Sequence, residues 1–319
     1  MTQEIQTVAE GEDGWLFLVG GSNKAASNYD RVTGETPDAK IAEWRKILEQ
    51  RRGRCALMGV RYIHCVIPDK LTIHGDKLRP PVDPALSPLA RLLEASAESP
   101  AAPLDLITPL RTERETQDLY WRTDTHLTPE GCLVIYRELC RAAGWTPVEN
   151  LLERPFERVT ASLDLGGKLH PPRLEDFRSY RYTRDARRIW TNAIVKIMED
   201  PVYQQAVHVG GRARFRNEGA ANRGRVLIFG DSYAGPGPNG LTAMLAETIS
   251  DVEFVWSTAI DWSLVRRSNP DVLITEIAER FMTLTPADRL SLWKLEFQQM
   301  ARAWRIRRRL WQAQIMQKS

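Results

Sequence analysis

Three short runs of apolar residues constrain the fold of this chain more than any other feature. They lie in the stretches "YIHCVIPDK", "GRVLIFGDSY" and "DVLITE", and segments with helical spacing separate them. A strand that is apolar along its whole length, rather than at every second residue, is buried on both faces. Strands of this kind that alternate with helices are typical of a parallel sheet with helices on each side. The sequence therefore predicts a three-layer α/β fold with a central, mostly parallel sheet.

Apolar spacing and end signals predict where the helices lie. After a Thr-Pro-Asp start at residues 36–38, Ile41, Trp44 and Leu48 recur at the spacing of one helical face. Apart from one helix, residues 146–222 give no clear signal of secondary structure. Further helices are expected near residues 89–97, 193–199 and 240–249, near Trp262, and from Thr285 onward.

The stretch "YWRTDTHLTPEG" places Asp124 two residues before His126 and directly in front of a predicted helix. Thr128 can cap this helix, Pro129 suits its first turn because a missing N–H costs nothing there, and Gly144 can end it. The Asp-Thr-His sequence is therefore expected on a loop that a helix holds from behind. An acid beside a histidine supplies two of the three groups of a hydrolase triad.

Ser232 in "FGDSYAG" is the predicted nucleophile. It follows the apolar strand at residues 225–229 directly, at the turn toward a helix. Its hydroxyl is therefore expected at the carboxyl end of the sheet, where open α/β folds build their sites. His126 can take the hydroxyl proton, and Asp124 can fix the tautomer of the ring. Gly-Asp-Ser and Asp-Thr-His are each common alone, but together, each at the edge of a predicted element, they predict a Ser-His-Asp triad.

Neither a metal site nor a cofactor is expected. The four cysteines form no Cys-x-x-Cys pair, and buried, reduced thiols are the interpretation that we prefer to zinc or a disulfide framework. Of the five histidines, only His126 has an acid two residues before it. His64 lies inside an apolar run and is expected to be a core residue.

Charge and hydropathy exclude two classes of protein. The net charge of +3 is too small to indicate a nucleic-acid partner. No window holds eighteen consecutive apolar residues, and the first residues show no signal-peptide pattern. As written, the sequence predicts a soluble, cytoplasmic protein.

The last predicted helix has two notable features. Its apolar residues recur on one face, and its later part carries five arginines. This arginine-rich surface is either a solvated helical face or a contact with an acidic surface, such as a membrane or a polyanionic glycan. We divide the chain into a catalytic domain at residues 1–284 and a basic amphipathic helix at 285–319. The apolar face consists of Trp293, Phe297, Met300, Trp304 and Trp311, and the arginines are at 302, 305, 307, 308 and 309.

Six stretches together resemble the SGNH-like domain of the alginate O-acetyltransferases AlgJ and AlgX. They are "GEDGWLFL", "VIPDK", "LYWRTDTHLTPEG", "DLGGKL", "VLIFGDSY" and "PDVLITEIAERF", and they span residues 11–281. In most SGNH enzymes the serine motif comes first, whereas here Asp124 and His126 precede Ser232. This reversed order resembles that of AlgJ and AlgX, whose domain is a circularly permuted SGNH fold.

The resemblance implies a function and adds site residues. It implies that Asp124, His126 and Ser232 are the triad, that an acetyl group is transferred to a sugar hydroxyl, and that Lys70 lies near the site. The "EIAER" segment, with Glu276 and Arg280 in our numbering, is expected to pair structurally. The resembling enzymes work in the periplasm. Leu127 stands where the family often has tryptophan.

Further residues are expected around the serine. The backbone N–H of Ser232, together with Asn217 or Gly230, is expected to stabilise the oxyanion. Asp231 and Tyr233 flank the nucleophile and are expected to contribute to substrate binding. Trp121, next to the Asp-Thr-His loop, is expected to pack into the core rather than to stack on a sugar.

Three functions remain open from the residues. The first is a serine-dependent O-acetyltransferase that forms an acyl-serine intermediate, with a glycan acceptor and a small molecule or an acyl-carrying protein as donor. The second is a carbohydrate acetylesterase with the same triad, since the triad does not distinguish a sugar hydroxyl from water. The third is a non-catalytic glycan-binding assembly subunit. We prefer an enzyme, because a degenerate relative is expected to have lost a triad residue.

Overall fold

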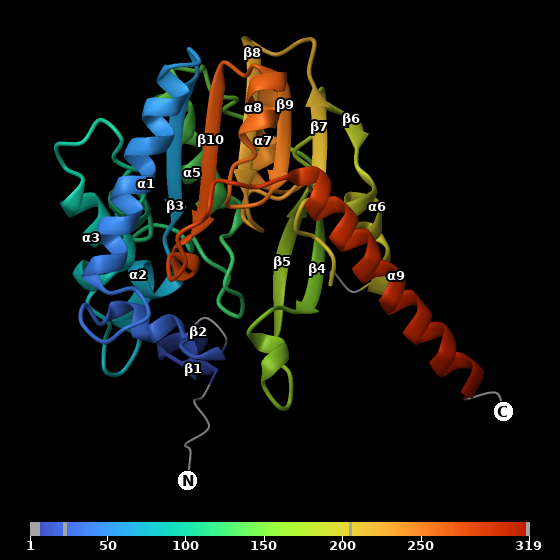
Figure 1. Ribbon diagram of the computed structural model, residues 1–319. Helices are drawn as coiled ribbons and strands as arrows, with labels where there is room; N and C mark the ends of the chain where they lie inside the picture. Colours follow the sequence, from blue (N-terminus) through green and yellow to red (C-terminus); the bar gives the residue numbers. More distant parts are fainter. Residues whose placement is uncertain (1–6, 22–23, 204–205, 317–319) are drawn as a thin grey trace.

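A six-stranded sheet runs through the middle of the molecule (Figure 1). The computed structural model describes residues 7–21, 24–203 and 206–316. The first four strands of the sheet are parallel to one another, and the last two continue it in antiparallel fashion. The predicted α/β fold with a mostly parallel sheet is confirmed. In spatial order the strands are β3 (Arg61–Ile67), β10 (Val272–Ala278), β8 (Asn222–Gly230), β9 (Ile249–Trp256), β7 (Arg212–Arg216) and β6 (Arg187–Thr191).

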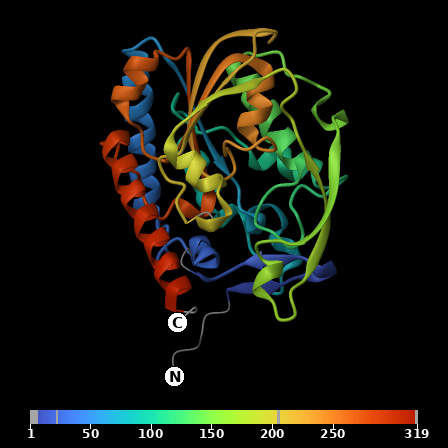
Figure 2. The ribbon, with the colours of Figure 1, turned by 90° about the vertical axis from the view of Figure 1, so that its right-hand side faces the viewer.

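One layer of helices packs on each face of the sheet (Figures 1 and 2). Apolar strand residues alternate between the two cores: Ile228 of β8 faces one, and Leu227 and Phe229 face the other. This arrangement explains why the strand sequences are apolar throughout. The helices on the Ile228 side are α4 (Ile107–Glu113), α5 (Pro129–Ala143) and α7 (Leu241–Thr248), and those on the other side are α1 (Asp38–Ala56), α3 (Pro88–Ala95) and α8 (Trp262–Ser268).

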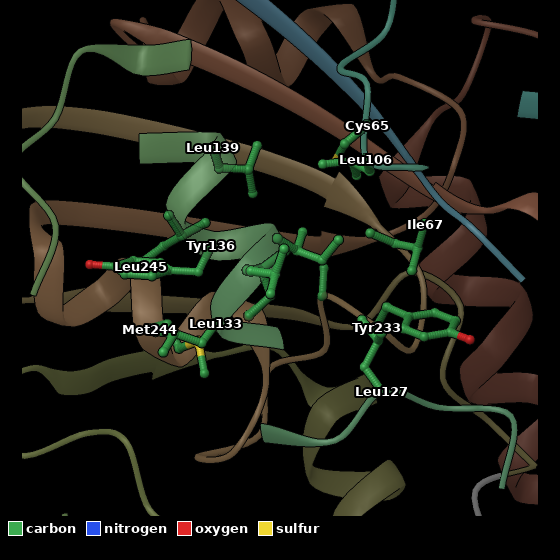
Figure 3. Close-up of a cluster of buried hydrophobic side chains, with 14 of the residues drawn as sticks. Cys65, Ile67, Leu106, Leu127, Leu133, Tyr136, Leu139, Tyr233, Met244 and Leu245 are labelled. Atoms are coloured by element: carbon green, nitrogen blue, oxygen red, sulfur yellow. The ribbon is translucent and has the colours of Figure 1, made fainter. Parts of the chain in front are cut away.

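The core on the α5 side extends to the region of the predicted site. Figure 3 shows Cys65 of β3, Leu139 of α5 and Met244 of α7 in this core. The same cluster continues to Leu127 and Tyr233, which neighbour His126 and Ser232 in the sequence. The two motifs are thus supported by one continuous packed layer.

Outside these layers the described residues also form two hairpins, three further α-helices and short 3-10 turns. The hairpin β4–β5 and the strands β6 and β7 fall within residues 146–222, where no strand was predicted. Most of the hairpin side chains are exposed, so no apolar run marks it. The hairpins are β1 (Val8–Glu10) with β2 (Leu16–Leu18) and β4 (Phe156–Ser162) with β5 (Leu174–Tyr180), and the helices are α2 (Lys70–His74), α6 (Ala193–Glu199) and α9 (Leu292–Met316).

The ends of α5 are formed by the residues that the sequence indicated. The Thr128 hydroxyl accepts the backbone N–H of Gly131 at 3.1 Å, and Gly144 ends the helix in a left-handed conformation with φ of 72°. The Thr-Pro-Asp start of α1 differs from the prediction, because Pro37 occupies the cap position and provides no side-chain hydrogen bond. The Thr36 hydroxyl instead donates to the side chain of Asn28.

We predict that Gly131→Ala destabilises the protein, although alanine is normally the better helix former. A Cβ at Gly131 would lie 2.2 Å from the carbonyl oxygen of Leu119, a backbone atom that cannot move aside cheaply. We expect a loss of about 1–3 kcal/mol in the free energy of unfolding, measured by urea denaturation. Gly53→Ala in α1 is the matched control, because a Cβ there meets nothing within 4 Å. It should stabilise by roughly 0.5–1 kcal/mol. Equal free energies of unfolding for the two variants would contradict the close contact between Gly131 and the Leu119 carbonyl.

Candidate active site

The side chains of Ser232, His126 and Asp124 meet at the carboxyl end of the parallel strands. Ser232 Oγ lies 3.0 Å from His126 Nε2, and His126 Nδ1 lies 2.7 Å from Asp124 Oδ1. Ser232 is exposed, His126 is half-buried and Asp124 is buried. This is the order of exposure that a serine nucleophile, its base and an orienting acid require.

The loop that carries Asp124 and His126 is closed by its own backbone. The N–H of Trp121 donates to the carbonyl of His126 at 3.2 Å, and Tyr120 and Leu127 form an isolated antiparallel bridge. Asp124 Oδ1 also accepts the backbone N–H of His126 at 2.9 Å. The acid and the imidazole are therefore held in one geometry before any substrate binds.

Asp124 is ionised at any pH near neutrality. Burial raises the pKa of its carboxyl, but the hydrogen bonds from His126 and the backbone N–H of Asp164 outweigh burial and lower the pKa to about 2. The carboxylate therefore holds Nδ1–H of His126 and leaves Nε2 to face Ser232 as a proton acceptor.

Tyr233 supports the triad from the protein side. Its hydroxyl donates to the carbonyl of Thr125 at 2.7 Å and accepts from Arg280 Nη1 at 3.1 Å. The same Arg280 nitrogen donates to the buried carboxylate of Asp69 at 3.0 Å. The ring centroids of Tyr233 and His126 are 4.9 Å apart. The Tyr233 hydroxyl is thus occupied by protein groups, and its role is to hold the loop rather than to bind substrate through that oxygen.

Asp231 likewise faces the protein rather than the solvent. Its carboxylate accepts the N–H of Tyr233 at 3.0 Å and that of Ala278 at 2.8 Å, which fixes the turn that carries the serine. Glu276 accepts the N–H of Asp231 at 2.9 Å, and burial, followed by the nearby Asp231 charge, raises the pKa of Glu276. A Cβ at Gly230 would lie 2.6 Å from Glu276 Oε2. Gly230 is therefore required by this close approach, and the prediction of Asp231 as a substrate ligand is corrected.

Asn217 does not belong to the site. It follows β7, and its backbone N–H donates to the carbonyl of Ser250 at 3.0 Å, at the amino end of β9. Its side-chain amide donates to the carbonyl of Glu247. Because Ser232 follows the carboxyl end of β8, Asn217 lies at the opposite end of the sheet and cannot contact the oxyanion.

Other N–H groups are better placed near the serine. The backbone N–H of Ser232 donates to no acceptor within the described part of the chain. Asn239 and Gly240 lie on the wall of the same small cavity as Ser232, just before α7 begins. Asn239 was missed in the sequence because nothing distinguishes it from an ordinary turn residue in the glycine- and proline-rich segment around it.

Two neighbouring cavities lie on this side of the molecule. A small one of about 200 Å³ is lined by Ser232 and His126, and a groove of about 780 Å³, lined by no triad residue, lies between residues 117–130 and the β4–β5 hairpin. Trp121 and Phe177 line both, with ring centroids 5.4 Å apart. Trp121 is half-buried and faces these cavities, so the expectation that it packs into the core is only partly correct.

The hairpin is attached to the loop by a residue that the sequence analysis missed. Glu175 of β5 accepts the backbone N–H groups of Arg122 and Thr123 at 2.9 and 2.7 Å, and the Thr123 hydroxyl at 2.6 Å. The carboxylate therefore fixes the groove wall relative to the triad. No local pattern predicts such a contact, because the partners are more than fifty residues apart.

The remaining histidines and cysteines show no metal site. No group of three or more His, Cys, Asp or Glu residues in the described part of the chain has the arrangement to hold a metal ion. His64 is buried, and its Nδ1 forms a hydrogen bond of 2.7 Å with the Thr275 hydroxyl. Burial lowers the pKa of His64 to about 3. It is the core residue that its sequence position indicated. The four thiols form no disulfide.

Lys70 lies beneath the loop and not in either large cavity. Its buried ammonium donates to the carbonyl of Leu16 at 2.7 Å and to that of Arg122 at 3.2 Å, and it lies 5.5 Å from the Trp15 ring. Burial lowers the pKa of Lys70 to about 7, although the Asp124 carboxylate opposes the shift. Lys70 therefore joins β2 to the chain just before the triad, and it lines neither of the two cavities described above.

We predict that Lys70→Met removes part of the pH dependence of stability. In the unfolded chain a lysine titrates near 10.4, so between about 7 and 10.4 unfolding takes up a proton at this site. The contribution of Lys70 to stability therefore rises with pH through this window and is lost as the pH falls toward 7. The difference in unfolding free energy between wild type and Lys70→Met should change by a few kcal/mol from pH 7 to 10. Lys46→Met, at an exposed lysine, is the control. A difference in unfolding free energy between wild type and Lys70→Met that stays constant from pH 7 to 10 would contradict the lowered pKa of Lys70.

Comparison with known proteins identifies a family. The family model of the SGNH hydrolase-like domain of the acetyltransferase AlgX matches residues 8–175, which include Asp124 and His126 and end before Ser232. Comparison with curated protein sequences finds no significant match.

Three solved structures share the fold. The O-acetyltransferase domain of Pseudomonas putida AlgJ aligns with a TM-score of 0.54 and 16% identity over 88% of this chain and 93% of its own. Bacillus cereus PatB1 aligns with a TM-score of 0.58 and 13% identity over 87% and 97%. Pseudomonas aeruginosa AlgX aligns with a TM-score of 0.53 and 17% identity over 87% of this chain and 63% of AlgX.

Proposed function

This chain belongs to the family of the SGNH hydrolase-like acetyltransferase AlgX, and from that premise we propose that it transfers an acetyl group to a polysaccharide hydroxyl with Ser232 as the nucleophile. One observation carries the proposal: Ser232 Oγ lies 3.0 Å from His126 Nε2, and the ring is held through Nδ1 by Asp124 at 2.7 Å. An exposed serine in contact with an oriented imidazole is suited to acyl transfer.

In the first step Ser232 Oγ attacks the carbonyl carbon of an acetyl donor. His126 Nε2 takes the hydroxyl proton, and Asp124 stabilises the imidazolium that forms. The carbonyl oxygen becomes an oxyanion, which accepts hydrogen bonds from the Ser232 N–H and from Asn239 or Gly240. The bond to the donor group then breaks, the leaving group takes the proton from His126, and acetyl-Ser232 remains.

In the second step a sugar hydroxyl attacks the acetyl-serine. The hydroxyl gives its proton to His126 Nε2 as the new ester bond forms, and the oxyanion uses the same N–H groups. The bond between the acetyl carbon and Ser232 Oγ breaks, and Oγ takes the proton back. The acetylated sugar leaves with the triad in its starting state.

An acetylesterase is the second candidate, because Ser232 is exposed and water can reach an acyl-enzyme there. The groove beside the small cavity favours the transferase, since it provides a place for a sugar chain next to the serine. A non-catalytic binding subunit is less favoured, because it has no need of an ordered Ser-His-Asp contact.

We predict that Ser232→Ala and His126→Ala each lower acetyl transfer by about 10³-fold or more, because the two residues act as one unit. A fluorophosphonate probe should label wild type at Ser232 and fail to label the His126 variant. Ser162→Ala, an exposed serine at the end of β4, is the control and should be labelled like wild type. Full activity of Ser232→Ala would show that the nucleophile is another residue.

A product analysis distinguishes acetyl transfer to a sugar from hydrolysis of the acetyl-enzyme. The wild type is incubated with a chromogenic acetyl ester, with and without oligosaccharides, and both acetylated sugar and free acetate are measured. Acetylated sugar supports the transferase. Free acetate alone under both conditions would make the protein an esterase.

The groove is suited to bind the acceptor by ring contacts rather than by net charge. Its charged lining residues nearly balance, and several are paired with each other: Arg178 with Glu130, and Arg122 with Asp118. The shared aromatic pair, Trp121 and Phe177, offers a flat apolar surface at the junction with the small cavity. We infer that an acceptor sugar ring packs on Trp121 as its hydroxyl approaches Ser232.

We predict that Trp121→Ala raises KM for an oligosaccharide acceptor roughly 2–10-fold and leaves hydrolysis of a small acetyl ester nearly unchanged. Trp121→Phe should restore most of the loss. Trp190→Ala, an exposed tryptophan on β6, is the matched control and should leave KM unchanged. If Trp121→Ala lowers activity equally with the oligosaccharide and with the small ester, Trp121 only holds the loop. If the wild-type KM for the oligosaccharide rises steeply with salt, the groove recognises the acceptor by its charge.

A further inference from the structure

The helix α9 lies on the outside of the molecule and touches the body with only one face (Figures 1 and 2). Ala303 is buried against Ile194, Tyr203 and Val207, and Ile306 packs against the same cluster. Leu292 is buried at the start of the helix. These contacts fix α9 and leave its other faces to solvent.

A second face of α9 is apolar and exposed. Five side chains, which we call the aromatic stripe, follow the spacing i, i+4, i+7, i+11 and i+18, so they lie along one side of the helix. Fourteen large hydrophobic side chains of the described residues are exposed, and six of them are on α9. Such a concentration marks an interaction surface. The aromatic stripe consists of Trp293 (78% exposed), Phe297 (70%), Met300 (42%), Trp304 (61%) and Trp311 (62%).

The helix is also strongly basic. It carries Lys294 and five arginines, and Glu296 is its one acidic residue. None of these arginines forms an ion pair with a described residue. The Arg308 guanidinium lies 5.5 Å from the Trp304 ring, so positive charge directly borders the aromatic stripe.

We propose that α9 binds the surface of an anionic lipid membrane through the aromatic stripe. Tryptophan is favoured at the boundary between acyl chains and head groups, because its ring is apolar and its N–H can remain hydrated. Arginines beside it attract acidic head groups. A second copy of this chain fits the surface less well, since two such helices would bring arginines together without acidic partners.

Binding of this kind lies in the plane of the membrane. No helix in the described part of the chain has the length and hydropathy that a bilayer-spanning segment needs. An interfacial helix needs only one apolar face and a basic one, and α9 has both in addition to the face that holds it to the body. The protein would therefore bind peripherally and reversibly, with binding that weakens as salt rises.

The test is flotation of the full chain with vesicles of phosphatidylcholine alone and with added phosphatidylglycerol. We expect wild type to float with the anionic vesicles and the double variant Trp304→Ser/Trp311→Ser to bind at least about tenfold more weakly. Arg307→Gln/Arg308→Gln should also bind more weakly and lose part of the salt dependence. Leu57→Ser, at a side chain 91% exposed outside α9, is the matched control and should bind like wild type.

Esterase activity in solution should be the same in all variants, which excludes unfolding as the cause. Absence of wild-type binding to anionic vesicles, or equal binding of the stripe variant, would overturn the proposal. A wild-type dimer that becomes monomeric in the stripe variant, by light scattering, without vesicle binding would also overturn it and assign the aromatic stripe to contact between copies.

Discussion

The hydrogen bond from the Tyr233 hydroxyl to the carbonyl of Thr125 joins the two halves of the site. One partner adjoins the serine and the other lies between Asp124 and His126, 108 residues apart in the chain. Neither motif contains a feature that would place the other. Their alignment comes from this contact, from Arg280 behind it, and from the packed layer that contains Tyr233 and Leu127.

The support behind the triad contains more ionisable groups than the triad itself. Arg280 and Asp69 form a buried ion pair, and Asp231 and Glu276 fix the turn before the serine. Buried charges are costly unless hydrogen bonds satisfy them, and breaking such a pair costs more than forming it contributes. The gain is geometric: a network with one satisfied arrangement holds Ser232 Oγ and His126 Nε2 in contact. The "EIAER" segment thus supports the site from the end of β10 and the residues just after it. Its Glu276 and Arg280 do not pair with each other: Glu276 accepts the N–H of Asp231, and Arg280 donates to Asp69.

The sequence predicted the parts of the molecule in which neighbouring residues determine the structure. The apolar runs fixed the sheet, and Thr128 and Gly144 identified the ends of α5. Ser232 was found because a buried strand ends just before it. Contacts between distant segments had no such signal. Glu175 accepts hydrogen bonds from the backbone N–H groups of Arg122 and Thr123, and no apolar pattern marks its hairpin, because most of the hairpin side chains are exposed. Asn217 was chosen for its amide alone, in a region whose path could not be read, and the structure places it at the wrong end of the sheet.

The β4–β5 hairpin forms a sheet of its own and joins the triad loop through the Glu175 carboxylate. One side of the groove is therefore built by residues outside the central sheet, and those of β5 also line the small cavity with Ser232. Mutations of β4 residues that line only the groove, such as Arg158 and Thr160, can change its polarity without altering the wall around Ser232. Acceptor range can consequently evolve through β4, while reactivity stays with the residues around Ser232.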